Sequence, residues 1–250
     1  MRNRDQAICI RTADYSETSQ VVSFLTRDAG VVRLIAKGTK RPKSKSGGAI
    51  DLLTEGDLVY TARSAEALGT LVEFTESASH AALRRDARRL NAALYAIELV
   101  GEILPVGDAQ RASFDLLHNT LGRLGEADAP LQPVLAYFQW RLLQQVGLLG
   151  DMTACVVCGR PVTDTEAWFS SREGGLLCGG CEAGIIEKYR LDAAARAGLA
   201  ALTAVQRGPA RRARRIALPD SQAVAANRVL AYHVREQLGK PLRMARFAIG

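Results

Sequence analysis

Four of the five cysteines have the spacing of a metal-binding site. They form two Cys-x-x-Cys pairs, Cys155 with Cys158 and Cys178 with Cys181, separated by 19 residues. Two tight turns of this kind can direct four thiolates at one tetrahedral ion, and the spacing is typical of zinc. Because four thiolates leave no position for a water, we expect one structural zinc per chain. A redox pair is the alternative, although that motif needs a single pair beside a βαβ unit.

Positive charge is concentrated in short stretches of the chain. The formal net charge is +7, and residues 191–250 alone contain 11 basic and 3 acidic residues. Such clusters favour a polyanionic partner, most commonly nucleic acid, and a solubilising surface is the alternative. The candidate nucleic-acid-binding residues are Arg33, Lys37, Lys40, Arg41, Lys43, Lys45, Arg211, Arg212, Arg214 and Arg215.

Common catalytic motifs are absent from the sequence. No glycine-rich phosphate loop opens a helix, and neither GxSxG nor HExxH occurs. The histidines, His80, His118 and His233, are far apart and lack catalytic signatures. A nuclease assembled from distant carboxylates is an alternative, but the sequence favours binding over catalysis.

Nothing in the sequence indicates a membrane or secreted protein. No apolar run approaches the roughly 20 residues that span a bilayer. The N-terminal residues lack the apolar core of a secretory signal. We therefore expect a cytoplasmic protein without a membrane partner.

The basic stretch at 33–45 lies within a predicted N-terminal barrel, residues 1–78. It begins in the third predicted strand and continues into the connection that follows. Alternating apolar residues predict short strands, and Cys9 is expected to be buried in the first of them. Five antiparallel strands with one long polar connection, residues 38–48, fit a Greek-key barrel of the OB type, and an SH3-like barrel is the alternative. Strands are expected at 7–11, 20–26, 31–37, 58–62 and 70–74, with a hairpin turn at 27–30.

The rest of the chain is predicted to be helical, which makes the fold α+β and multidomain. We expect one helical bundle from residues 79–154 and 191–250, with the cysteines in an inserted module, residues 155–190, that contains a short hairpin. The first helix should end at Pro105 and bury Leu83, Ala87, Leu90, Leu94, Ile97, Gly101 and Leu104. Further helices are expected at 109–124, from Pro133 to 146, at 192–206 and at 220–238.

Four arginines of the first predicted helix form a third basic cluster: Arg84, Arg85, Arg88 and Arg89. On one helix they would place like charges four residues apart, which costs about 0.3 kcal/mol per pair. This arrangement predicts contact with an anion, either DNA phosphate or an acidic protein tail. Neutralisation by acids of the barrel is the alternative.

Several segments resemble the bacterial DNA repair protein RecO family, in family order over nearly the whole chain. Residues 7–19, 26–30 and 36–44 resemble the family's N-terminal barrel. Residues 138–147 leading into Cys155–Gly159 resemble its helix-to-zinc junction, and residues 237–243 resemble its C-terminal motif. Gln139 stands where we expect a glutamate from the family pattern.

The resemblance implies a non-catalytic recombination mediator. Such proteins bind single- and double-stranded DNA and anneal complementary strands. Together with RecR they help RecA to load onto strands coated by single-strand-binding protein. RecA is therefore an indirect partner. The acidic C-terminal tail of that protein is an implied partner. A protein-binding adaptor that acts on acidic tails without binding DNA is the alternative, and a transcription regulator is a third.

Overall fold

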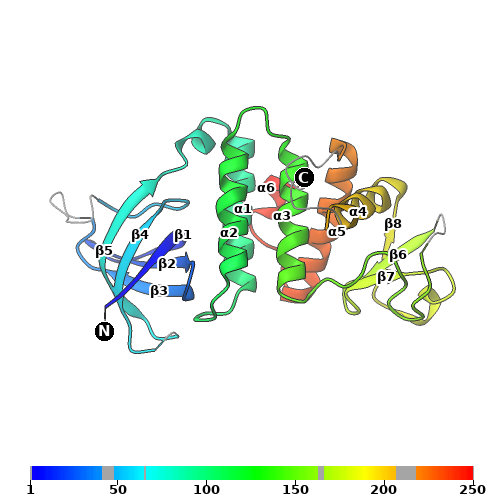
Figure 1. The fold of residues 1–250 in the computed structure, drawn as a ribbon, viewed down its shortest axis with the longest axis horizontal. Coiled ribbons are helices and arrows are strands. Elements are labelled where there is room, and N and C mark those ends of the chain that lie inside the picture. The colour runs from blue at the N-terminus through cyan, green and yellow to red at the C-terminus, as the bar shows by residue number, and fades with distance from the viewer. Residues whose placement is uncertain (1, 41–47, 65, 163–165, 207–217, 250) are drawn as a thin grey trace. The chain divides into compact units, whose positions relative to one another are not determined.

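The computed structural model of the chain divides into two compact units, residues 1–127 and 128–250. It describes residues 2–40, 48–64, 66–162, 166–206 and 218–249 (Figure 1). The first unit contains a barrel and two long helices, and the second contains the other long helices and the four-cysteine module. The first two helices are therefore grouped with the barrel, whereas the sequence analysis places all helices in one bundle. The domain bounds given there stay a prediction.

Five strands close the N-terminal barrel, in agreement with the sequence prediction. They are β1 (Asn3–Ser16), β2 (Ser19–Thr26), β3 (Gly30–Ala36), β4 (Glu55–Thr61) and β5 (Gly69–Ala78). Their order is β1-β2-β3-β5-β4, with β1 paired to β4 and a short parallel contact between β3 and β5. This arrangement confirms the five-stranded Greek-key barrel of OB type.

Strand β1 is much longer than the predicted strand at 7–11. Its first half pairs with β4 and its second half with β2, so β1 connects these two strands and closes the barrel. A register shift between Cys9 and Arg11 lies next to the change of partner, and a second one between Asp14 and Ser16 lies at the end of β1. Such irregularities bend a strand and increase its twist, which a closed barrel requires.

Alternate strand residues point into the barrel and form its apolar core. Phe24 and Phe74 meet there with ring centroids 5.1 Å apart. Cys9 is fully buried, which confirms its prediction as a buried strand residue, and burial raises the pKa of its thiol. The core residues are Ala7, Cys9, Val22, Phe24, Val32, Leu34, Ala36, Ile50, Leu58, Tyr60, Leu71 and Phe74.

The predicted hairpin at 27–30 is confirmed between β2 and β3. The Asp5 carboxylate accepts hydrogen bonds from the amides of Asp28 and Ala29, at 3.0 and 3.1 Å. Gly30 has a φ of 71°, and a Cβ at this position would lie 1.9 Å from the Asp108 carbonyl oxygen. The turn therefore requires glycine for both its backbone conformation and its close contact.

The first long helix begins at Ala87, four residues after Leu83, the first residue of the predicted apolar stripe. A 3₁₀ helix, η1 (Ala81–Arg85), precedes α1 (Ala87–Ile103), and Asp86 caps α1 by accepting from the Arg88 amide at 2.8 Å. Helix α1 contacts β1 and α2 (Arg111–Gly125), so it buries more than one stripe. Of the predicted stripe, Leu83, Ile97 and Leu104 are buried, whereas Ala87 and Gly101 are exposed.

The second unit is built on helix α5 (Asp220–Leu238), which packs against α3 (Leu131–Gln145) and α4 (Ala193–Gln206). A buried amide pair joins two of these helices, because Gln139 Nε2 donates to Asn227 Oδ1 at 2.7 Å. A glutamate at position 139 would lack this donor. The short helix α6 (Ala245–Ala248), which the sequence analysis omits, ends the described chain.

The four-cysteine module contains a small antiparallel sheet. The predicted hairpin is present as β6 (Ala167–Ser170) and β7 (Gly175–Leu177), and β8 (Tyr189–Leu191) pairs with the other edge of β6. A short 3₁₀ helix, η2 (Glu182–Gly184), follows the second cysteine pair. Among the described residues, no helix is both long and apolar enough for a transmembrane span.

Candidate metal centre and nucleic-acid interface

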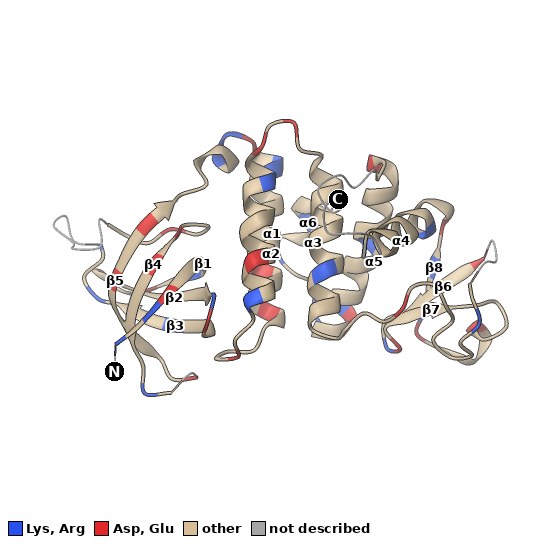
Figure 2. Ribbon diagram, viewed as in Figure 1, with Lys and Arg blue, Asp and Glu red and all other residues tan. Residues whose placement is uncertain are grey.

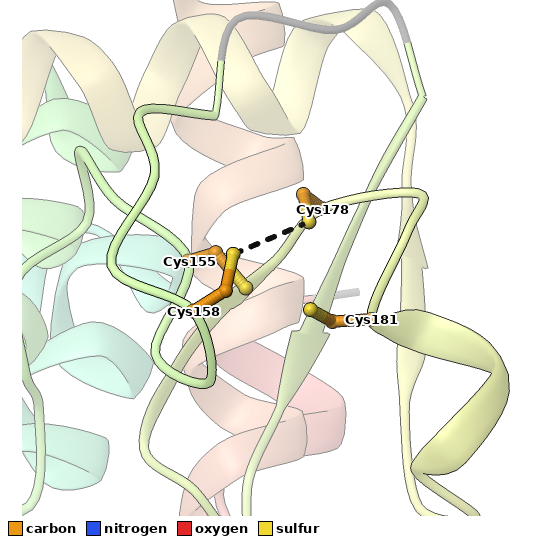
Figure 3. Close-up of side chains that lie close together, drawn as sticks. All are labelled: Cys155, Cys158, Cys178 and Cys181. Carbon is orange, nitrogen blue, oxygen red and sulfur yellow. Dashed lines mark hydrogen bonds between the residues drawn. The ribbon is translucent and has the colours of Figure 1, made fainter.

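The four predicted cysteine ligands come together at the end of the β6–β7 hairpin. Their sulfur atoms all lie within 4.8 Å of one another. Figure 3 shows the side chains converging from two separate turns of the chain. The Sγ atoms of Cys158 and Cys178 are 3.8 Å apart.

Each cysteine pair is held by a backbone turn. In the first turn the Gly159 amide donates to the Cys155 carbonyl at 2.8 Å, and Gly159 has a φ of 71°. In the second turn the Cys181 amide donates to the Cys178 carbonyl at 3.0 Å. The first turn is also attached to the sheet, because the Val156 amide donates to the Leu176 carbonyl at 2.8 Å. The sulfur positions are therefore set by main-chain hydrogen bonds.

The sulfur geometry fits a tetrahedral metal ion. Bonds of about 2.3 Å from a central ion to four thiolates place neighbouring sulfurs about 3.8 Å apart. The Cys158–Cys178 separation of 3.8 Å agrees with this value. The four cysteines can therefore hold one metal ion with all four positions filled by protein.

Two thiols of the cluster have pKa values shifted in opposite directions. Burial alone would raise the pKa of Cys155, but hydrogen bonds from the backbone amides of Cys178, Cys158 and Val157 outweigh it and lower the pKa to about 6. Cys181 behaves oppositely, since hydrogen bonds with Cys158 and Cys178 raise its pKa to about 12. The sulfurs thus share protons that a bound cation would displace.

Two polar groups that the sequence analysis does not identify attach this module to α5. His233 is buried, with its Nε2 2.8 Å from the Leu148 carbonyl and its Nδ1 2.7 Å from the Ser171 hydroxyl. Because Nε2 faces a carbonyl, it carries the ring proton and Nδ1 accepts from Ser171. Burial lowers the pKa of His233, which keeps the ring neutral. The Glu187 carboxylate accepts from the Tyr232 hydroxyl and from the Ser171 amide. No local sequence pattern signals these contacts.

Three of the predicted nucleic-acid-binding residues of the barrel belong to the part of the chain that the structure describes. Arg33 is exposed on β3, opposite Ser23 of β2, and Lys37 is exposed directly after β3. Lys40 is half-buried and forms an ion pair with Asp14. Figure 2 shows basic and acidic residues along the strands and helices of both units. The remaining candidates, Arg41, Lys43, Lys45, Arg211, Arg212, Arg214 and Arg215, lie outside the described residues.

The premise of the third basic cluster, one continuous helix, is wrong. Arg84 and Arg85 belong to η1, and only the other two arginines belong to α1, because Asp86 interrupts the helical backbone. Arg84 donates to the Asp51 carboxylate at 2.8 Å, and Arg89 donates to the Ala127 carbonyl at 2.7 Å. These two side chains hold parts of the first unit together. Arg85 and Arg88 are exposed, and neither forms an ion pair within the described part of the chain.

A carboxylate between two histidines joins the barrel to η1 and α2. Glu55 of β4 lies 2.8 Å from His118 Nδ1 and 3.4 Å from His80 Nε2. Burial raises the pKa of Glu55, but the hydrogen bonds to His80 and His118 outweigh it, so the pKa is lowered. A lowered pKa means that the charged carboxylate stabilises the folded state.

We expect Glu55→Gln to lower the free energy of unfolding by about 1–2 kcal/mol at pH 7, because hydrogen bonds to a charged group are lost. The contribution of Glu55 is complete above the ordinary glutamate pKa and disappears as the pH falls through the lowered value. The variant should therefore approach the parent in stability on acidification. Urea unfolding at several pH values measures this, with Glu76→Gln, an exposed glutamate of β5, as the control. A constant difference at every pH would contradict it.

Comparisons with known proteins cover both units. The chain matches the family models "Recombination protein O N terminal" over residues 1–78 and "Recombination protein O C terminal" over residues 84–245. DNA repair protein RecO of Anaeromyxobacter dehalogenans strain 2CP-C is 32% identical over 240 residues, which cover 96% of this chain and 93% of that protein. DNA repair protein RecO of Symbiobacterium thermophilum is 31% identical over 246 residues, covering 96% and 94% of the two chains. The barrel, the cysteine module and these similarities agree: the chain belongs to the RecO family of DNA repair proteins.

Proposed function

We propose that the protein is a non-enzymatic recombination mediator that binds single- and double-stranded DNA and anneals complementary strands. The observation that carries this proposal is an OB-type barrel with exposed cations on and after β3, in a chain of a DNA repair family. Barrels of this type bind nucleic acid along one face and its loops. Its place of action would be the nucleoid in the cytoplasm.

The charge distribution supports binding through phosphates. Arg33 is exposed in the middle of β3 and Lys37 is exposed directly after it, where the basic connection begins, and residues 29–50 contain no acid. Each phosphate that a cation neutralises releases condensed counterions, so affinity arises without base recognition. A mediator that acts at any sequence needs such a contact. Aromatic residues make up only 6% of the chain, so electrostatics should outweigh stacking at the barrel.

The proposed partners follow from the family resemblance. RecR would act together with this protein, and RecA would benefit indirectly on strands coated by single-strand-binding protein. The acidic tail of that protein would meet a basic surface, for which Arg85 and Arg88 are the exposed members of the third cluster that form no ion pair with a described residue.

We propose zinc as the metal of the four-cysteine centre, with Cys155, Cys158, Cys178 and Cys181 as its ligands. Four thiolates suit zinc in softness and geometry. The ion would hold the two turns together without taking part in a reaction. In this role it would stabilise the module that His233 and Glu187 attach to α5.

Strand binding and annealing by the purified protein test the proposal. We expect single-strand affinity to fall linearly with salt on a log–log plot, by about 0.7 per contacted phosphate. Mixed complementary strands should anneal faster with the protein and without ATP, also when single-strand-binding protein and RecR are present. Non-complementary strands are the control. Binding of the acidic tail peptide without any strand binding would support the adaptor alternative instead.

A further inference from the structure

The C-terminal segment, residues 239–249, has a buried face that fixes its conformation. Gly239 ends α5 with a φ of 66°, and Leu242, Ala248 and Ile249 are buried. The Ala248 amide donates to the Met244 carbonyl at 3.0 Å, which closes the turn of α6. The Ala248 carbonyl in turn accepts from Gln132 Nε2 of α3 at 3.4 Å. The segment is thus attached to α3 within the second unit.

The exposed side chains of this segment, its exposed face, include three cations and one aromatic ring. Lys240, Arg243 and Arg246 are exposed, and Phe247 is 53% exposed. The guanidinium carbon of Arg246 lies 4.5 Å from the centroid of the Phe247 ring. The last acidic residue of the chain is Glu236, so residues 237–250 contain no negative side chain.

The exposed part of the Phe247 ring, with the Arg246 guanidinium beside it, is apolar and planar surface that a ligand can cover. The described chain covers only about half of the Phe247 side chain, so a bound ligand would bury further apolar surface. A flat ring with an adjacent guanidinium plane is the surface on which nucleic-acid bases stack. Cations repeated at every third residue suit the repeating phosphates of a strand. A peptide of acidic side chains alone would use the cations but not the planar surface.

We propose that this face binds single-stranded DNA, with a base stacked on Phe247 and phosphates held by Lys240, Arg243 and Arg246. The ligand class rests on the proposed DNA binding, but the site belongs to the second unit and is independent of the cations on and after β3. Two binding surfaces on one chain suit annealing, which requires two strands to be held at once.

Phe247→Ala tests the site by comparing two ligands, oligo-dT and an abasic oligonucleotide of equal length. We expect at least a roughly fivefold loss of affinity for oligo-dT, and no change for the abasic strand, because only the stacking contact is removed. Phe247→Leu keeps an apolar side chain and should show the same loss, whereas Phe247→Tyr keeps the ring and should bind normally. Ile186→Ala is the matched control, because Ile186 is an exposed apolar residue of the same unit.

Each result assigns the cause. If the parent protein binds oligo-dT and Phe247→Ala binds it equally well, this inference is wrong and the proposed function is untouched. If the parent binds neither strand, the proposed function itself fails, and this inference fails with it. Loss of acidic-peptide binding in Phe247→Ala, with oligo-dT affinity unchanged, would assign the face to a protein partner and overturn the inference.

Discussion

Cys178→Ser is expected to remove the bound metal and to unfold the four-cysteine module. Structural zinc in small domains binds with an apparent free energy of about 10–16 kcal/mol. This is comparable with the whole stability of a typical domain, about 5–15 kcal/mol. Serine preserves the size of the side chain and the Cys178 carbonyl, which accepts from the amides of Cys181 and Glu182. The substitution therefore changes the metal ligand and little else.

Elemental analysis and thermal unfolding measure this effect together. The parent protein, purified under reducing conditions, should contain one zinc per chain, and the variant should contain less and unfold at a lower temperature. Cys9→Ser is the matched control, because Cys9 is also a buried cysteine but lies in the barrel core. It should lose some stability and retain its zinc. A parent protein without metal, or a Cys178→Ser variant that keeps a full equivalent, would refute the assignment.

Removal of the positive charges after β3 should have the largest effect on DNA binding. Replacing Lys37, Lys40, Arg41, Lys43 and Lys45 by alanine removes five cations from one continuous stretch. We expect weaker binding to single strands of every sequence alike, because phosphate contacts carry no base information. The salt dependence should become shallower by about 0.7 for each lost contact. The barrel core contains none of these residues, so the fold should persist.

The structure refines this experiment. Lys40 is paired with Asp14, whereas Arg33 and Lys37 are exposed without an ion pair to any described residue. Arg33→Ala with Lys37→Ala should therefore weaken binding more than Lys40→Ala. Arg123→Ala on α2, which removes a cation paired with Glu126, is the control. Unchanged affinity and salt dependence in the fivefold variant would show that this stretch only solubilises the protein.

Local patterns in the sequence predicted most secondary-structure elements. The β2–β3 hairpin, α2, α4 and α5 lie close to their predicted positions, because periodicity and turn residues act over a few neighbours. Elements that depend on distant partners were missed or misplaced. Strand β8 exists as an edge of β6, and β1 extends because it has two partners.

The arginines of η1 and of the start of α1 show why tertiary contacts are needed to predict the position of a helix and the pairing of its charges. The apolar spacing of the helix alone allows a start at Leu83, whereas in the structure Asp86 caps α1, which begins at Ala87. In the structure Arg84 reaches Asp51, which is 33 residues away in the sequence. Such contacts decide which arginines of the cluster form an ion pair, as Arg84 does, and which form none with a described residue, as Arg85 and Arg88.

The sequence by itself determined the spacing of the four cysteines and the position of the basic segments, since these depend on residue type and short spacing. Only the tertiary structure decided how the barrel closes, that His118 and His80 share Glu55, and that Ser171 meets His233. It also decided that Leu242, Ala248 and Ile249 turn inward while Phe247 remains exposed. The physical reason is that burial and pairing arise between segments far apart in the chain, and no local period records which segments will meet.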